Sequence, residues 1–261
     1  MSTEINISEL TKGVTITTPR TLPVILLLDA SGSMNDNGKI IQLNEAVREM
    51  IGEFAKNDST VAKINVAVIT FGGASAQLHQ PLVAADQIQW HDLTADGMTP
   101  MGDALKMAKE MSEDKTIMAN TYKPTIILVS DGMPNDSCWQ EELDKFTKEG
   151  KSSKYDRMAM GIEVSKNSEE YDVLKQFVSN PEMIFQAKDA TSIRKFFRFL
   201  SRSITKQSLS QNPNVKDKSE PKLCELDKIE NDDMSNIELN LDFINKRDDD
   251  NNEETSLYDM P

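Results

Sequence analysis

Residues 22–34, Leu-Pro-Val-Ile-Leu-Leu-Leu-Asp-Ala-Ser-Gly-Ser-Met, join an apolar run to a polar turn. The apolar part, Val24 to Leu28, is too short to cross a membrane, which takes about 20 residues. A continuous run of this length is typical of a strand covered on both faces, as in the middle of a parallel sheet. The run ends at Asp29, so we expect the next polar residues on the turn that leaves the strand. Open α/β sheets bind their ligands at such turns.

The turn carries three oxygen-bearing side chains in the pattern Asp-x-Ser-x-Ser. Asp29 supplies a carboxylate, and Ser31 and Ser33 supply hydroxyls. Oxygen ligands without nitrogen or sulfur suit a hard divalent cation such as Mg²⁺ better than zinc or copper. The turn is therefore a candidate metal site.

Apolar runs and amphipathic periods alternate along the chain. Residues 124–130 form a second continuous apolar run, and residues 38–56 carry apolar side chains at helical spacing. This alternation predicts an α/β fold, a doubly wound, mostly parallel central sheet with helices on both faces. The other expected strands are 63–71, 78–83, 157–162 and 183–186. One further helix is expected to begin with Thr99 as its N-cap and Pro100 in the first helical position. The remaining expected helices cover 139–149, 168–177 and 190–206.

Composition divides the chain into three parts. We expect an N-terminal arm over 1–14, the α/β domain over 15–206 and a disordered acidic tail over 207–261, which holds 6 Lys and Arg against 15 Asp and Glu. The apolar patch at 237–244 in the tail has two interpretations, a docking motif or scattered apolar residues in a solubilising segment. The tail could also act as a ligand for a partner or as a plug for its own domain.

Charge and cysteine content exclude several function classes. The net charge of -14 argues against nucleic-acid binding and against acidic membrane surfaces, both of which need a basic face. Cys138 and Cys224 lie far apart without a zinc-binding spacing, so we expect free thiols. The sequence shows neither a signal peptide nor a transmembrane run, and we expect a cytoplasmic protein.

Two later motifs are expected to join the first turn. Thr99 begins a helix, and Asp131 follows the second continuous apolar run. In the common strand order 3-2-1-4-5-6, the first and fourth strands are neighbours at the topological switch point. We therefore expect one crevice formed by Asp29, Ser31, Ser33, Thr99 and Asp131. Mg²⁺ held there would keep coordination positions for water or for an incoming carboxylate.

This arrangement closely resembles the von Willebrand factor A (VWA) domain and its metal-ion-dependent adhesion site (MIDAS). The resemblance covers about residues 22–203 and rests on the Asp-x-Ser-x-Ser element, the Thr99 element and Ser130-Asp131-Gly132. It implies that these residues bind Mg²⁺, with Mn²⁺ or Ca²⁺ as other cations. It also implies that an Asp or Glu of a partner protein completes the metal shell. The implied role is regulated protein binding and not catalysis.

Within that family the chain looks most like small bacterial cytoplasmic proteins of the tellurite-resistance TerY type, often encoded beside a protein kinase and a protein phosphatase. This implies a stress-response, defence or signalling role, with a kinase or phosphatase as a possible partner. Two features depart from the pattern. Met98 stands where many relatives have glycine, and the C-terminal region, with a single cysteine and no histidine, lacks the zinc-binding tail of some TerY-like proteins.

Each motif also has an interpretation without a metal. Ser31 and Ser33 could cap the next helix, Thr99 could be an ordinary N-cap, and Asp131-Gly132 could be a turn. Independent caps need not follow two buried strands in this order, so the combination favours the metal site. Asp103, in the first turn of its helix, is expected to complement the helix dipole and not to be a ligand.

A metal-dependent hydrolase or phosphotransferase that uses the same cation is the alternative function. His79 and His91 are expected at the surface, which leaves no well-placed general base. Trp90 and Trp139 lie near the Thr99 and Asp131 loops in sequence. We expect each of them either in the core or on the rim of the metal face.

Overall fold

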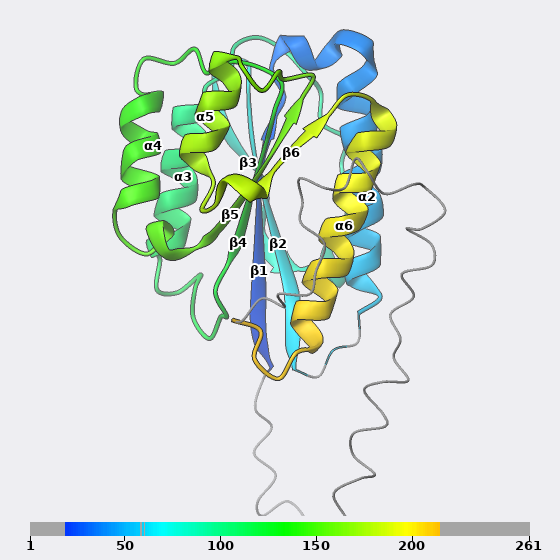
Figure 1. Cartoon of the computed structure of the whole chain (residues 1–261). Helices are drawn as coiled ribbons and strands as arrows, with labels where there is room; N and C mark the ends of the chain where they lie inside the picture. Colours follow the sequence, from blue (N-terminus) through cyan, green and yellow to red (C-terminus); the bar gives the residue numbers. More distant parts are fainter. Residues whose placement is uncertain (1–18, 58, 60, 215–261) are drawn as a thin grey trace, which may run out of the picture. The chain divides into compact units, whose positions relative to one another are not determined.

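The structure, a computed structural model, describes residues 19–57, 59 and 61–214 (Figure 1). The strands are β1 Arg20–Asp29, β2 Ala62–Gly72, β3 Ser75–Ala84, β4 Thr125–Ser130, β5 Asp156–Ile162 and β6 Ile184–Ala187. The α-helices are α2 Lys39–Ala55, α3 Met101–Glu113, α4 Trp139–Lys148, α5 Glu169–Phe177 and α6 Ala190–Leu209. The 3-10 helices are η1 Gly32–Gly38, η2 Ala85–Gln87, η3 Ser152–Lys154 and η4 Pro181–Met183.

The strands form one six-stranded sheet in the order β3-β2-β1-β4-β5-β6. Neighbouring strands are parallel, except that β2 and β3 are antiparallel. The predicted doubly wound α/β fold and its strand order are confirmed. β3 is longer than the expected strand 78–83. It is antiparallel because only Gly73 and Ala74 separate it from β2, and so short a connection can form a hairpin but not a crossover.

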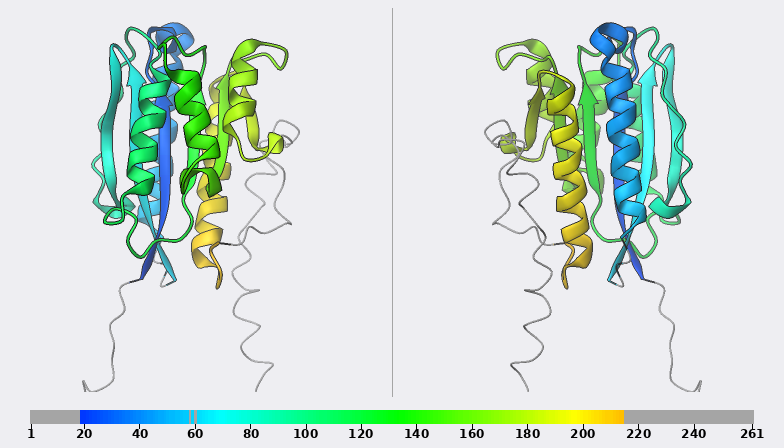
Figure 2. Two further views of the ribbon diagram at one scale, coloured as in Figure 1. Left: turned by 90° about the vertical axis from the view of Figure 1, so that its left-hand side faces the viewer. Right: turned by 90° about the vertical axis from the view of Figure 1, so that its right-hand side faces the viewer.

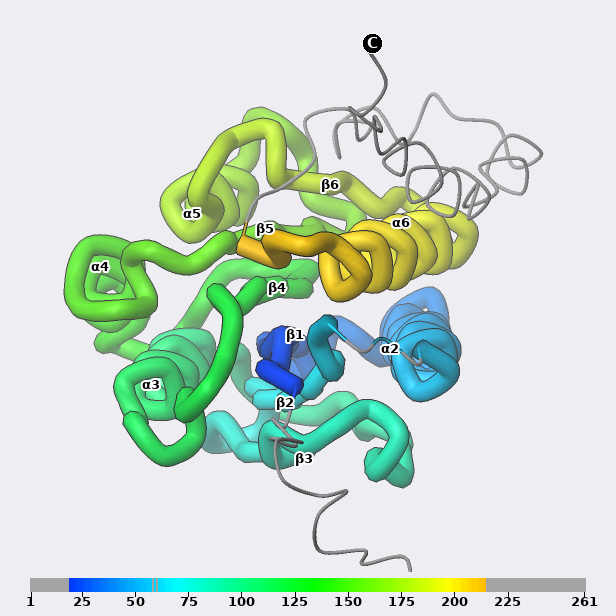
Figure 3. The backbone as a smooth tube through the Cα atoms, turned by 90° about the horizontal axis from the view of Figure 1, so that it is seen from below, coloured from blue at the N-terminus to red at the C-terminus, as the bar shows by residue number. Residues whose placement is uncertain are grey.

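Helices cover both faces of the sheet (Figure 1, Figure 2). α3, α4 and α5 lie on one face, and α2 and α6 lie side by side on the other. Seen along the strands, the sheet runs between these two helical layers (Figure 3). The central strands must therefore be apolar on both sides, which explains the continuous apolar runs of β1 and β4.

Alternating side chains of β1 contribute to both layers of the core. Ile25 and Leu27 pack in the cluster that contains Met101 of α3. Leu26 and Leu28 are also fully buried and point to the opposite face, because successive strand side chains alternate. Complete burial of one leucine side chain contributes roughly 1.5–3 kcal/mol to stability. Packing on both faces holds the ends of β1 and β4 in a defined place.

Two helix starts differ from the prediction. The expected helix 38–56 is preceded by η1, and the chain bends between η1 and α2, where Asn37 and Gly38 have φ angles of 55° and 70°. Helix α3 begins at Met101 with Pro100 in the N-cap position, one residue later than expected. Thr99 therefore lies outside the helix that it was expected to cap.

Several predictions fall outside the described residues. These are the N-terminal arm 1–14, the apolar patch 237–244 and Cys224, together with most of the expected tail. Helix α6 ends at Leu209, beyond the expected tail boundary at 207. None of the helices in the described part of the chain is both long and apolar enough to span a membrane.

Candidate metal centre

Asp29 ends β1, and its side chain is fully buried. Its Oδ1 accepts a 2.8 Å hydrogen bond from the backbone N–H of Ser31, and its Oδ2 accepts a 2.6 Å hydrogen bond from the hydroxyl of Ser130. Ser130 lies beside it because Leu28 pairs with Val129 in the β1–β4 register. Donors from two neighbouring strand ends thus orient this carboxylate.

The environment of Asp29 disfavours an unneutralised negative charge. Burial raises the pKa of its carboxyl above the ordinary value. Hydrogen bonds from Ser130 and Ser31 oppose this rise in pKa, and the charge of Asp131 adds to it. A divalent cation would favour the ionised carboxylate.

Ser31 and Ser33 connect this turn to the end of β4. The hydroxyl oxygens of the two serines are 3.1 Å apart, and the Ser33 hydroxyl donates a 2.8 Å hydrogen bond to Oδ1 of Asp131. Because Ser33 uses its single proton on Asp131, Ser31 is the donor to Ser33. Ser31 occupies the N-cap position of η1, but its side chain makes no capping bond there. Capping therefore does not explain the Ser31 hydroxyl.

Asp131 is the second carboxylate of the group, and its side chain is only 1% exposed. Its Oδ2 accepts a 2.7 Å hydrogen bond from Nζ of Lys39. Burial would lower the pKa of the Lys39 ammonium, but the hydrogen bonds and charges of Asp131 and Glu163 outweigh this effect and raise it. Lys39 is therefore a buried cation beside the predicted metal ligands.

Backbone contacts place the loop before Thr99 against the Asp29 turn. Asp96 N–H donates to the carbonyl of Ala30 at 2.9 Å, and Gly32 N–H donates to the carbonyl of Gly97 at 3.1 Å. Gly97 has a φ of 66°, and a Cβ there would lie 2.6 Å from the Cα of Gly73. Only glycine allows these two backbones to approach so closely. Asp96 contributes to this contact through its backbone.

Thr99 is buried and is attached to the Asp131 loop by its backbone. Its N–H donates a 2.8 Å hydrogen bond to Oδ1 of Asn135, and its carbonyl accepts one from the N–H of Asn135 at 3.2 Å. Thr99 precedes the N-cap position of α3, which Pro100 occupies without a side-chain cap. The structure thus links four predicted residues by side-chain bonds or a turn and positions Thr99 beside them through its backbone.

Four residues of this network were not predicted from the sequence. Ser130 directly precedes Asp131 and Asn135 follows it by four residues, and this nearness to a candidate ligand was the only available signal. Lys39 and Glu163 gave no signal, because their contacts depend on the bend after η1 and on the register of β4 and β5.

Other residues singled out from the sequence have contacts of their own. Asp103 lies with Asp136 and Cys138, whose possible ligand atoms are within 4.8 Å of one another. Burial raises the pKa of the Cys138 thiol, and the two carboxylates raise it further. Trp139 is partly buried against the core, and the ring of Trp90 lies 5.2 Å from that of His79.

The predicted donor set fits a hard divalent cation. Two carboxylates and two hydroxyls meet at the ends of β1 and β4, and Thr99 offers a third hydroxyl from the adjoining loop. All these donors are oxygens, as Mg²⁺ prefers. Five side chains cannot fill an octahedral shell, so a position would be left for water or for a partner's carboxylate.

The sequence profile of the von Willebrand factor type A domain matches residues 24–199. No curated protein sequence matches the chain. Similar solved structures include proximal thread matrix protein 1 from the mussel byssus with a zinc-occupied MIDAS motif (TM-score 0.52, 20% identity, 70% of this chain and 46% of that chain). Two others are the pilus adhesin SpaC from Lactobacillus rhamnosus GG (TM-score 0.58, 14% identity, 73% and 31%) and the vWF domain of the pili tip protein Mfa5 from Porphyromonas gingivalis (TM-score 0.53, 12% identity, 72% and 96%).

These structures share the fold, and the aligned region is less than half of the mussel protein and of SpaC. VWA domains are generally metal-dependent protein-interaction modules. The matched segment runs from β1 into α6 and contains every element that supplies a candidate ligand. The chain therefore belongs to the von Willebrand factor type A domain family.

Proposed function

We propose that this protein is a metal-dependent protein-binding module. In this proposal a Mg²⁺ ion is held, directly or through water, by Asp29, Ser31, Ser33, Thr99 and Asp131. An Asp or Glu of a partner protein completes the metal shell. Mn²⁺ and Ca²⁺ are the alternative cations, because they also prefer oxygen ligands.

The observation that carries the proposal is the hydrogen-bonded chain from Ser31 through Ser33 to Asp131. It joins side chains at the ends of two strands that are separated by about 100 residues in sequence. Asp29 adds a second buried carboxylate at the same edge. Two acidic groups brought together out of water need neutralising positive charge, and a divalent cation would add to the one charge that Lys39 supplies.

The surroundings of the site suit a protein partner. Met98, next to Thr99, is 52% exposed and presents an apolar side chain at this edge. A partner that covers the site would bury it, and flexible Met side chains adapt to different surfaces. Among the similar structures, the mussel protein has a zinc-occupied MIDAS motif, SpaC is a pilus adhesin and Mfa5 is a pili tip protein, which supports such a role.

The cellular setting is proposed from sequence resemblance alone. A TerY-type protein would act in the cytoplasm in stress resistance, defence or signalling, and a protein kinase or phosphatase would be the candidate partner. Hydrolysis is less well supported. His79 belongs to the edge strand β3 and contacts the carbonyl of His91, so this pair is not at the β1–β4 switch point.

Metal binding is tested by calorimetric titration of the full chain with MgCl₂, MnCl₂ and CaCl₂. We expect saturable binding at one site, and we expect Asp29→Asn to abolish it. Asp103→Asn is the matched control, because it removes a carboxylate from the neighbouring group with Asp136 and Cys138. Loss of binding in Asp103→Asn with full binding in Asp29→Asn would contradict the proposed site.

Partner binding is tested by affinity capture from the native cell extract, with wild type and Asp29→Asn, each in Mg²⁺ and in EDTA. We expect a protein that is retained only by wild type in Mg²⁺. Equal retention in all four samples would contradict a metal-completed interface.

A further inference from the structure

Lys39 connects the predicted metal ligands to a residue that the proposed site does not use. Its Nζ is 2.7 Å from Oδ2 of Asp131 and 3.3 Å from Oε2 of Glu163. The Lys39 side chain is 10% exposed, so its ammonium depends on these two carboxylates more than on water. The ammonium thus occupies one oxygen of a predicted metal ligand.

The backbone positions these groups in an uncommon way. Asn37 and Glu163 both have left-handed conformations, with φ angles of 55° and 59°. The bend at Asn37 starts α2 with Lys39 beside the end of β4, and the N–H of Glu163 donates to the carbonyl of Ala187 at 2.7 Å. Asn37 Nδ2 also donates to Oε1 of Glu163 at 3.2 Å. The left-handed conformation is energetically unfavourable for non-glycine residues, and such backbone strain often marks a functional position.

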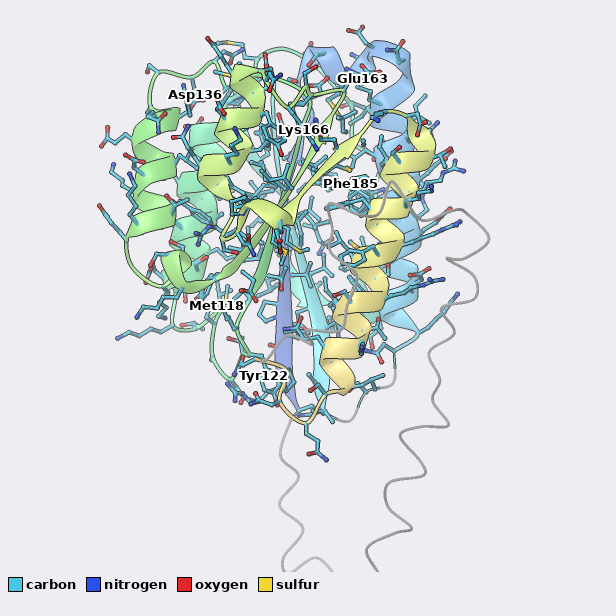
Figure 4. The ribbon with its side chains drawn as sticks, in the orientation of Figure 1. Met118, Tyr122, Asp136, Glu163, Lys166 and Phe185 are labelled. Atoms are coloured by element: carbon cyan, nitrogen blue, oxygen red, sulfur yellow. The ribbon has the colours of Figure 1, made fainter. Side chains whose placement is uncertain are left out.

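The two acceptors of Lys39 lie in different surroundings. The Asp131 side chain is 1% exposed, whereas the Glu163 side chain is 42% exposed. Figure 4 shows Glu163 at the end of the strands where η1 also lies. An ammonium on a flexible stem can move between acceptors this close with a small change of its torsion angles. Glu163 can therefore receive the ammonium without any movement of the backbone.

We propose that Lys39 competes with the divalent cation for Asp131, and that Glu163 takes over the Lys39 ammonium when the cation binds. This inference rests on the proposed function, because it takes Asp131 as a metal ligand. Lys39 lowers the affinity of the site for the metal, because a cation must displace it. Glu163 raises that affinity, because it keeps the displaced ammonium from being left buried and unpaired.

The pair has opposite expected effects on metal binding. Removing Lys39 leaves the carboxylates of Asp29 and Asp131 available to the metal. Removing Glu163 takes away the second acceptor of the Lys39 ammonium, which then stays paired with Asp131. Residues that contact a metal ligand, and not the metal itself, commonly change metal affinity by roughly 10- to 100-fold when they are substituted. A general electrostatic effect of Glu163 on metal binding would be the same with and without Lys39. The proposed exchange, in contrast, requires Lys39.

The test is calorimetric titration of the full chain with MgCl₂ for a double-mutant cycle of Lys39→Gln and Glu163→Gln. We expect Lys39→Gln to bind more tightly than wild type, and Glu163→Gln to bind roughly 10-fold more weakly. In the Lys39→Gln background, Glu163→Gln should change the affinity by less than about twofold. Glu169→Gln, at an exposed acid six residues further along, is the matched control and should match wild type.

Other outcomes separate this inference from the proposed function. Wild type that binds no Mg²⁺, or Asp29→Asn that binds like wild type, would overturn both. Mg²⁺ binding that needs Asp29 but is weakened by Lys39→Gln would overturn only the competition, because Lys39 would then orient Asp131. An equal effect of Glu163→Gln in both backgrounds would also overturn it. Lys39→Arg keeps the charge, and should bind no more tightly than wild type if charge is the cause.

Discussion

The hydroxyl of Ser130 donates a 2.6 Å hydrogen bond to the buried carboxylate of Asp29 across the β1–β4 pair. This bond partly offsets the cost of burying a negative charge, and it orients the Oδ2 atom. Ser130, which ends β4 and precedes the predicted ligand Asp131, thus supports the predicted ligand Asp29 at the end of β1. The two strand ends form one unit, and each of its supports can be removed separately.

Ser130→Ala should weaken Mg²⁺ binding by roughly 10- to 100-fold, because Asp29 loses the donor that fixes its orientation. The affinity is measured by calorimetric titration, and thermal unfolding checks that the variant is folded. Ser137→Ala changes an exposed serine in the loop after Asp131 and should bind like wild type. Equal affinity of Ser130→Ala and wild type would show that the Asp29–Ser130 bond has no part in metal binding.

Gly97→Ala should lower both the free energy of unfolding and the metal affinity. A left-handed alanine costs about 1–2 kcal/mol, and its Cβ would also collide with the Cα of Gly73, so the loop that carries Thr99 must move. Urea unfolding and Mg²⁺ titration measure the two effects.

Gly73→Ala is the matched control for the effect of Gly97→Ala. Gly73 has a φ of 64°, but its added Cβ would meet nothing within 4 Å. It should lose similar backbone stability and keep the metal affinity of wild type. Equal metal affinity in the two variants would contradict a positioning role for the close approach of Gly97.

Asn135→Ala should weaken Mg²⁺ binding roughly 10-fold, because the buried Thr99 loses the acceptor of its N–H. Asn135→Asp keeps an acceptor oxygen and should stay nearer to wild type. Mg²⁺ titration of both variants tests this order of affinities. Weaker binding by Asn135→Asp than by Asn135→Ala would show that the Thr99 backbone bond does not position the ligand.

The central part of the fold could be predicted from sequence because β1 and β4 are buried on both faces. Strands in that position are continuous apolar runs, and each of these runs ends at its polar turn. The strand order then placed Asp29 and Asp131 at neighbouring strand ends. The predicted start of α3 was wrong by one residue. Pro100 can occupy the N-cap or the first helical position, and local sequence does not choose between them.

The supporting residues could not be predicted, because their contacts arise from tertiary structure. Lys39 reaches Asp131 through the bend at Asn37 and Gly38, and an Asn-Gly pair in the sequence marks a turn but does not give the direction of the chain after it. Glu163 follows β5, whose pairing with β4 places it near the same carboxylate. Oxygen-rich motifs at strand ends can be recognised in the sequence, whereas a cation that comes from another element cannot.

Asp189 permits a prediction of pH dependence away from the metal centre. It is the N-cap of α6, and its Oδ1 accepts hydrogen bonds from both the N–H and the hydroxyl of Ser192 at 2.8 Å. These bonds, the backbone bond first, hold the pKa of the Asp189 carboxyl below its ordinary value of 3.8. A depressed pKa in the folded state means that the ionised group stabilises the fold above the unfolded pKa. This contribution is lost as the pH falls through the folded pKa.

Asp189→Ala should therefore lower the free energy of unfolding by about 1 kcal/mol at pH 7, as loss of an N-cap usually does. The difference from wild type should shrink as the pH falls below 3.8, the ordinary pKa of the carboxyl. Urea unfolding at a series of pH values down to 3 measures this change. Asp189→Asn keeps an acceptor oxygen but has no charge, so its small loss of stability at pH 7 should also shrink at low pH. A difference between Asp189→Ala and wild type that stays constant from pH 7 to pH 3 would show that packing, and not the charged cap, stabilises the start of α6.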